Sequence, residues 1–295
     1  MQILKKILYY IALGVSHLPL RVLYVFADII RPFVSGYRRK IVKKNINNAF
    51  PEKTEVERKK IVRQFYHHFC DVIVETLKMM SISKEEIARR MVFEGVEEME
   101  DLLNDHPFVF IYLGHYCNWE WIASLPMWTK RCYPGQVYKP LRDKWMDELF
   151  LKMRTRFGGN CMDKNKILRI VMQLKNENKP TIIGFISDQT PKWDSIHDWV
   201  NFLHQDTPVF TGTERMARKV NAAIVFGDVE RIKRGYYKCT LRKMCTDVNA
   251  LPEYALTEMY MKEMEKMICR QPQYWLWSHN RWKRQRNEAQ EKTNR

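Results

Sequence analysis

The sequence lacks the cysteine pairs that would indicate a disulfide framework or a zinc module. Its seven cysteines are spread along 295 residues and include no C-x-x-C pair. We therefore expect neither a metal site nor a disulfide-stabilised fold, and we predict reduced thiols packed as small apolar side chains. The chain is long enough for one large domain or two modest ones built around a hydrophobic core.

A clean membrane-spanning run of about 18 uninterrupted apolar residues is also missing. The most apolar segment, from Ile7 to Val34, is interrupted by His17, Pro19 and Asp28. No small-residue cleavage site follows it, so a secretory signal peptide explains it poorly. The segment passes instead into a cluster of basic residues: Arg31, Arg38, Arg39, Lys40, Lys43 and Lys44.

This order, an interrupted apolar segment and then cations, is expected of an anchor beside an anionic membrane. Each cation near such a surface contributes about 1 kcal/mol. The bias of basic residues predicts that the body of the protein stays in the cytoplasm. Such an anchor can be a helix that spans the membrane or one that lies flat on it, and the sequence leaves both open. The alternative to an anchor is an ordinary amphipathic helix packed on the core.

Acidic residues are outnumbered, with 34 Asp and Glu against 50 Lys and Arg and a formal net charge of +16. Such an excess is expected to face an anionic partner, which can be nucleic acid, an anionic bilayer or an acidic protein. No recognisable nucleic-acid-binding module is present, because Trp and Tyr occur in apolar helices and strands. Nucleic acid is therefore not expected as a partner.

From Pro107 onward, short apolar runs alternate with helical segments. The run 108–113 is apolar throughout, as expected of a strand buried on both faces. Further strands are predicted at 136–138, 181–186, 222–229 and 236–241, and helices at 118–127, 143–157, 165–176, 211–219 and 252–269. This alternation is typical of an α/β fold with a mainly parallel central sheet flanked by helices, whose sites lie at the carboxyl ends of strands.

These patterns divide the chain into four parts. They are an N-terminal membrane-associated helical segment with a basic flank (1–45), a helical lead-in (46–106), an α/β core (107–283) and a basic tail (284–295). Within the lead-in, apolar positions recur at helical spacing from Val62 to Met80, which predicts a long buried helix.

The segment 113–121 directly follows the first buried strand and is the strongest candidate for a site. Gly114 permits a tight exit from the strand and places His115 in the turn at the sheet edge. Asn118 is predicted to cap a following helix, with Glu120 in its first turn. Residues five apart in one helix are separated by about 140°, so contact between His115 and Glu120 requires the histidine to precede the helix.

A carboxylate bonded to one imidazole nitrogen fixes the tautomer and leaves the other nitrogen to remove a proton from a hydroxyl. The sequence thus predicts a His115–Glu120 dyad that acts as a general base. The bare H-x-x-x-x-E pattern occurs by chance in many proteins, so a structural histidine is the alternative. Metal binding is disfavoured, because one His and one Glu supply only two ligands.

The segment 114–120 resembles the H-x4-D/E signature of the lysophospholipid acyltransferase superfamily, and more closely the late acyltransferases of lipid A biosynthesis in Gram-negative bacteria. Further segments match that family in order: Tyr138-Lys-Pro-Leu-Arg142, Arg156-Phe-Gly158, Ser187-Asp-Gln-Thr-Pro191, Phe210-Thr-Gly212, Pro272-Gln-Tyr-Trp-Leu-Trp277 and Arg281-Trp-Lys283. The match extends from the N-terminal segment to Lys283. The glutamate at the second motif position looks most like members from Bacteroidetes.

The resemblance implies a glycerol-phosphate-acyltransferase-like fold with an N-terminal helical membrane anchor. It also implies an enzyme that moves a fatty acyl chain from an acyl carrier protein or CoA thioester to a hydroxyl of a glycolipid, a lipid A precursor. His115 and Glu120 are then the catalytic dyad, and the hydroxyl attacks the thioester directly. No cofactor is implied, and the expected location is the cytoplasmic face of the bacterial inner membrane.

Seven further residues are expected to bind or shape the site of the substrates. Arg142 is expected to hold an acceptor phosphate or to stabilise negative charge, with a surface ion pair as the alternative. Lys139 and Arg156 are expected to contact phosphates, and Asp188 and Gln189 to line the same sheet edge, with a capping turn as their alternative role. The full set is Asn118, Lys139, Arg142, Arg156, Asp188, Gln189 and Gly212.

Three other functions stay open at this point. The first is an O-acyltransferase for a lysophospholipid or an amino-acid-containing lipid. The second is a metal-dependent hydrolase built on His115 and Glu120. The third is a non-enzymatic basic protein bound to a membrane or to nucleic acid, in which the histidine is structural.

Overall fold

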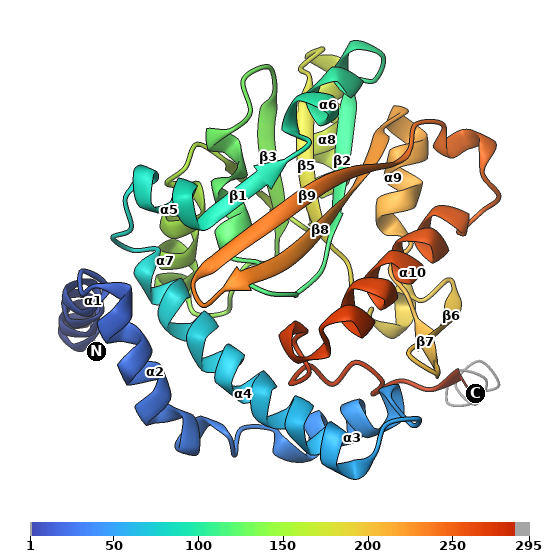
Figure 1. Ribbon diagram of the computed structural model, residues 1–295. Helices are drawn as coiled ribbons and strands as arrows, with labels where there is room; N and C mark the ends of the chain where they lie inside the picture. Colours follow the sequence, from blue (N-terminus) through green and yellow to red (C-terminus); the bar gives the residue numbers. More distant parts are fainter. Residues whose placement is uncertain (1, 287–295) are drawn as a thin grey trace.

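Strand β2, Phe108–Leu113, runs through the middle of a seven-stranded sheet, and all six of its side chains are buried. The structure is a computed structural model that describes residues 2–286 (Figure 1). On one side β2 pairs in parallel with β5, Thr181–Ile186, and on the other with β8, Ala223–Lys233. The continuous apolar run therefore marks a strand covered on both faces, as predicted.

The sheet has the strand order β1-β9-β8-β2-β5-β3-β4. All neighbouring pairs in it are parallel except β8 with β9, which form an antiparallel hairpin. The remaining strands of the sheet are β1 (Met91–Glu94), β3 (Tyr133–Tyr138), β4 (Asn160–Asp163) and β9 (Tyr236–Cys245). A separate antiparallel pair is formed by β6 (Trp199–Phe202) and β7 (Gln205–Pro208). The predicted mainly parallel sheet flanked by helices is confirmed.

In the described part of the chain, seven helices follow the N-terminal region and flank the sheet (Figure 1). They are α4 (Glu55–Lys78), α5 (Lys84–Arg90), α6 (Val96–Asp101), α7 (Lys144–Thr155), α8 (Ile167–Asn176), α9 (Gly212–Val220) and α10 (Ala255–Arg270). Short 3₁₀ helices occur at Leu102–Asn104, Trp121–Met127, Trp193–Ser195, Val248–Ala250 and Pro272–Tyr274. Strand β1 lies before residue 107, so the sheet begins earlier in the chain than the predicted core.

The strand register brings two distant loops together. Leu113, the last residue of β2, lies opposite Ile186, the last residue of β5. Residues two positions beyond these ends, His115 and Asp188, therefore leave the same edge of the sheet side by side. This is the carboxyl edge, where open α/β sheets place their sites.

Helix α4 is the long buried helix that the apolar spacing predicts, although it begins earlier, at Glu55. Thr54 and Glu57 form a capping box, in which each side chain accepts a hydrogen bond from the other residue's backbone N–H. This pair of bonds fixes the start of the helix. The body of α4 lies between the N-terminal helices and the sheet (Figure 1).

The N-terminal region forms α1 (Gln2–Ser16), α2 (Leu20–Val34) and α3 (Arg39–Ala49). Helix α2 packs on α4 through a buried face that includes Leu23, Tyr24 and Ala27. Large apolar side chains of α1 and α2 point outward: Ile7, Leu8, Tyr10, Ile11, Val22, Val25, Phe26, Ile29 and Phe33.

Within residues 2–286, no individual helix has both the length and the apolar character needed to cross a membrane. The segments Lys5–Ser16 and Leu20–Val34 meet both criteria only when taken together, and they are bent by 117° relative to each other. Most of the predicted basic tail, from residue 287 onward, lies outside the described residues.

Candidate active site

His115 lies at the carboxyl edge of the sheet with its imidazole bonded to a buried carboxylate. His115 Nδ1 is 2.6 Å from Asp188 Oδ1, and the backbone N–H of His115 donates to Asp188 Oδ2 at 2.9 Å. The His115 side chain keeps 20% of its surface exposed, whereas Asp188 is almost fully buried. One side of the ring is therefore held by the protein while part of the ring remains accessible.

Asp188 is fixed by a third donor, the indole Nε1 of Trp275, at 2.8 Å from Oδ2. The segment around Trp275 runs beside the His115 loop, because Cys117 N donates to Tyr274 O and Leu276 N donates to His115 O. Burial alone would raise the pKa of Asp188, but the charge of His115 and the hydrogen bonds from His115 and Trp275 lower it to about 2. Asp188 is thus an ionised acceptor at neutral pH.

The hydrogen bonds of the His115 ring define its tautomer. An ionised Asp188 only accepts, so Nδ1 carries the proton in the neutral ring and Nε2 presents a lone pair. The side-chain amide of Gln189 donates to that Nε2 at 3.2 Å. Asp188 and Gln189, both predicted to line this edge, therefore contact the two ring nitrogens of His115. Nε2 is oriented as a proton acceptor.

The depressed pKa of Asp188 predicts a pH dependence of stability. The carboxyl changes from an ordinary pKa of 3.8 to about 2 on folding, so its contribution is present above pH 4 and is lost as pH falls through about 2. The difference corresponds to about 2 kcal/mol. We expect wild-type protein to lose that much more unfolding free energy than Asp188→Asn between pH 5 and pH 2, measured by urea denaturation. Equal losses in the two proteins would contradict the assignment.

No hydrogen bond or ion pair joins Glu120 to His115 among residues 2–286. The two carboxylate oxygens of Glu120 accept hydrogen bonds from Arg154 of α7, Oε2 from Nε at 2.9 Å and Oε1 from Nη2 at 2.7 Å. The predicted contact within the His115–Glu120 dyad is therefore not formed: His115 pairs with Asp188, and Glu120 pairs with Arg154. No local pattern in the sequence indicates this partner, which lies 34 positions away on another helix.

The prediction of a helix at 118–127 was wrong, since only a 3₁₀ helix forms, at Trp121–Met127. Cys117 takes a left-handed conformation with φ of 51°, and Pro126 lies inside the 3₁₀ helix. Asn118 does cap this turn, because its Oδ1 accepts from Trp121 N at 3.0 Å. The Asn118 side chain is fully buried, so its predicted contact with a substrate is not available in this arrangement.

The other predicted site residues take three different positions. Lys139 and Arg142 are exposed just beyond β3, on the same sheet edge as His115. Arg156 instead donates to the backbone carbonyls of Met79 and Ile82, the latter at 3.1 Å, so its guanidinium is engaged by the protein. Gly212 begins α9, and a Cβ there would meet nothing within 4 Å, so its surroundings are open.

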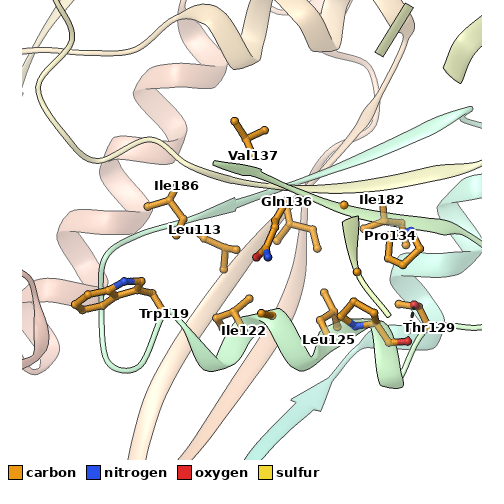
Figure 2. A pocket seen from close by; sticks show the side chains of 16 residues that line it. Leu113, Trp119, Ile122, Leu125, Thr129, Pro134, Gln136, Val137, Ile182 and Ile186 are labelled. Atoms are coloured by element: carbon orange, nitrogen blue, oxygen red, sulfur yellow. Dashed lines mark hydrogen bonds between the residues drawn. The ribbon is translucent and has the colours of Figure 1, made fainter. Parts of the chain in front are cut away.

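An apolar pocket lies between the strands of the sheet and the segment that follows His115 (Figure 2). Trp119, Ile122 and Leu125 lie along one side of it, and strand residues line the side opposite. The strand contributors include Ile111 and Leu113 of β2, Gln136 and Val137 of β3, and Ile182, Gly184 and Ile186 of β5. The Trp119 ring centroid is 5.5 Å from that of His115, so Trp119 packs against the imidazole and also lines the pocket.

The side chains around His115 offer acid–base chemistry next to a pocket that suits an apolar group. Across residues 2–286, no group of three or more His, Cys, Asp and Glu side chains is placed to hold a metal ion. The combination of a base and an apolar pocket fits a reaction in which a hydroxyl attacks an acyl compound.

Comparisons with known proteins agree with this chemistry. A family model described as "Bacterial lipid A biosynthesis acyltransferase" matches residues 4–284. The chain is 26% identical over 251 residues to the lipid A biosynthesis lauroyltransferase of Escherichia coli (strain K12), covering 83% of this chain and 79% of that protein. It is 23% identical over 258 residues to the lipid A biosynthesis palmitoleoyltransferase of the same organism, covering 86% and 81%. A lipid A biosynthesis acyltransferase of Shigella flexneri matches with the same identity and coverage as the palmitoleoyltransferase.

Proposed function

Because the chain belongs to the bacterial lipid A biosynthesis acyltransferase family, we propose that it moves a fatty acyl chain from an acyl carrier protein or CoA thioester to a hydroxyl of a lipid A precursor, with His115 as general base. The observation that carries the proposal is the placement of His115, whose ring is oriented by Asp188 and packs against Trp119, a residue that lines an apolar pocket. Acyl transfer needs these two features, a base for the hydroxyl and a binding site for the chain.

The reaction proceeds by direct attack. The acceptor hydroxyl takes the place of the Gln189 amide at Nε2 and loses its proton to that nitrogen as its oxygen attacks the thioester carbonyl. The carbon–sulfur bond then breaks, and the imidazolium returns the proton to the leaving thiolate. Asp188 stabilises the imidazolium between these steps. The released Gln189 amide is available to donate to the oxygen that becomes negative during the attack.

Two carboxylates are candidates for the residue that orients His115. The contact in the structure favours Asp188. The motif resemblance favours Glu120, which would have to leave Arg154 to reach the imidazole. We assign the role to Asp188, because a carboxylate already held by three donors is pre-organised, and we keep Glu120 as the alternative partner.

The apolar pocket is proposed to bind the acyl chain. It extends from Trp119, beside His115, to Thr129 and Pro134 at the opposite end (Figure 2). Along β5 it covers Ile182 to Ile186, four residue steps or about 13 Å. The depth of such a pocket sets the length of the chain that fits.

Gly184 lies in the middle of this wall, opposite Ile111 in the register of β2 and β5. An added Cβ would lie 3.5 Å from Leu113 Cδ1, which is an ordinary contact, so Gly184→Ala should fold while filling part of the pocket. We expect the variant to favour shorter over longer acyl donors by about tenfold relative to wild type, since one methylene in an apolar pocket discriminates to that degree. Competition between donors of different chain length measures the ratio.

The control for this prediction is Gly36→Ala, an added methyl in the loop between α2 and α3, where the nearest atom is Phe33 O at 3.6 Å. Its chain-length preference should equal that of wild type. An unchanged preference in Gly184→Ala would show that the acyl chain binds elsewhere.

Basic residues at the same sheet edge are proposed to bind phosphates of the acceptor. Lys139 and Lys164 directly follow the paired strands β3 and β4, and Lys164 N donates to Tyr138 O at 2.8 Å. Burial, and then the charges of Lys139 and Lys192, lower the pKa of Lys164, which indicates that the three lysines lie near one another. Arg142 follows Lys139 on the same loop, so the cluster can meet an anionic headgroup.

The outward apolar side chains of α1 and α2 are proposed to contact the cytoplasmic face of the inner membrane. Phe33 is 83% exposed, and the exposed cations Arg39, Lys40, Lys43 and Lys44 follow on α3. An apolar helix face followed by cations suits the boundary of an anionic bilayer. The acceptor lipid and the enzyme would then share one surface.

Mass spectrometry of lipids tests the proposed reaction. Expression in a host that lacks its own late acyltransferase should restore one acyl chain to lipid A. His115→Ala, produced at the same level, should not restore it. Unchanged lipid A together with a new diacylated amino-acid lipid or phospholipid would contradict lipid A as the acceptor.

A further inference from the structure

Helix α4 carries a buried stripe of polar residues that the proposed chemistry does not use. His68, Asp71 and Glu75 are spaced by three and four positions, so they share one face of the helix. Asp71 and Glu75 are fully buried and His68 is 3% exposed. Asp71 is paired with Arg231 and Arg234 of the β8–β9 hairpin. The other two residues of the stripe contact the segment 116–121, which directly follows His115.

Glu75 gathers hydrogen-bond donors from three different parts of the chain. Its Oε2 accepts from the Asn118 amide at 2.7 Å and from the Tyr237 hydroxyl at 2.8 Å. Its Oε1 accepts from the Tyr24 hydroxyl of α2 at 2.6 Å. Its backbone carbonyl accepts from the Trp121 indole at 3.1 Å. A fully buried carboxylate is costly unless such donors surround it, so this arrangement is specific.

His68 binds the same segment at Cys117, one residue before Asn118. Burial and the charge of Arg231 lower the pKa of His68 to about 3, so the ring is neutral. Its Nε2–H donates to Cys117 O at 3.1 Å, while Arg231 Nη1 donates to Nδ1 at 3.3 Å. Cys117 has a left-handed backbone, which is unfavourable for a residue with a side chain. The turn therefore needs outside support, and α4 provides it.

The turn at Cys117 connects the two parts of the proposed site, the base and the acyl pocket. His115 precedes it, and Trp119, Ile122 and Ala123 of the pocket wall follow it. A shift of the turn would move the imidazole relative to the acyl pocket. Small misplacements of reacting groups are costly for catalysis even when they arise away from the chemistry.

Resting on the proposed function, we infer that Glu75 is a positioning residue of the active site: through Asn118 it fixes the turn between the base and the acyl pocket, and through Tyr24 it ties that turn to α2. Helix α2 carries on its other face the apolar side chains proposed to contact the membrane. Glu75 is thus the buried link between the lipid-facing helix and the catalytic segment.

An exchange of amide and carboxylate tests the inference. Glu75→Gln leaves one acceptor oxygen where there were two, so an amide N–H group faces either Asn118 or Tyr24 in place of the acceptor that each now has. Asn118→Asp places two carboxylates against each other. Each single variant should lower kcat at least tenfold and leave KM within about threefold, because the turn moves while the substrate sites persist. In the double variant the amide at position 75 can donate to the carboxylate at position 118, whose other oxygen still accepts from Trp121 N. This variant should recover kcat to within about threefold of wild type.

The matched control is Glu100→Gln. Glu100 is also a buried carboxylate, and its Oε1 accepts from the backbone N–H groups of Lys130 and Arg131 at 2.8 and 2.9 Å. This variant should lower Tm and leave kcat per folded molecule unchanged. Wild-type kcat in Glu75→Gln, or no recovery in the double variant, would overturn the positioning role.

Two further measurements keep the test decisive. If Glu75→Gln does not fold, Tyr237→Phe removes one donor to the same Oε2 and should lower kcat severalfold at unchanged KM; wild-type kcat there would overturn the inference. Acyl transfer by the wild-type enzyme and by His115→Ala is measured first, and only the wild type should be active. A wild type without transfer would count against the proposed function, whereas active wild type with unaffected Glu75 variants would count against the inference alone.

Discussion

Replacing Asp188 by Asn is expected to lower kcat by about 10²- to 10⁴-fold, while KM for the acyl donor changes little. The amide has nearly the same shape, but it carries no charge to stabilise the imidazolium, and its N–H group can impose the wrong tautomer on His115. Asp188 receives hydrogen bonds from the His115 ring, the His115 backbone and Trp275, so the geometry around it should otherwise survive. Steady-state transfer of a labelled acyl chain measures the loss.

Glu120→Gln is the matched control for this expectation. The amide that replaces the carboxylate keeps one acceptor for Arg154, and no hydrogen bond joins Glu120 to His115 among residues 2–286. We therefore expect kcat to fall less than about tenfold. A loss in Glu120→Gln as large as that in Asp188→Asn would return the orienting role to Glu120, as the motif suggests. The pair of variants separates the two carboxylates directly.

Arg154→Met is expected to lower the free energy of unfolding by about 3–5 kcal/mol, because it leaves the Glu120 carboxylate without its charged partner. Arg154 and Glu120 are only 22% and 10% exposed, and they are joined by two short hydrogen bonds. The pair connects α7 to the segment that carries the pocket wall. Urea denaturation followed by circular dichroism measures the change.

An exposed ion pair provides the comparison. Lys59 bonds to Glu55 at 2.7 Å, but the two side chains are 68% and 73% exposed. Exposed pairs contribute little to stability, so Lys59→Met should be close to neutral. Equal destabilisation by both substitutions would mean that Glu120 does not depend on Arg154, and the carboxylate would then be free to serve His115.

The central strands could be predicted from the sequence because their signal is local. The run 108–113 and the run 181–186 are apolar enough to identify β2 and β5 within a residue. Their parallel pairing also places His115 and Asp188 together, since each lies two residues past its strand. Both residues were predicted at this edge, but the assignment of Glu120 by the motif obscured their pairing.

The features that could not be predicted from the sequence depend on distant contacts. Strands β1 and β4 lie at the edges of the sheet, are four residues long and contain polar residues, so no apolar run marks them. The turn at Cys117 is held by His68 of α4 and by Tyr274, from opposite ends of the chain. These contacts replace the helix that local propensity predicts at 118–127.

Nuclear magnetic resonance of protein with ¹⁵N-labelled histidine tests the pairing of His115 with Asp188 most directly. Loss of a signal in His115→Ala identifies the ring. In the neutral ring we predict a protonated Nδ1 and an unprotonated Nε2, with chemical shifts that change in Asp188→Asn and persist in Glu120→Gln. A ring protonated at Nε2, or one that responds to Glu120→Gln and ignores Asp188→Asn, would contradict the account.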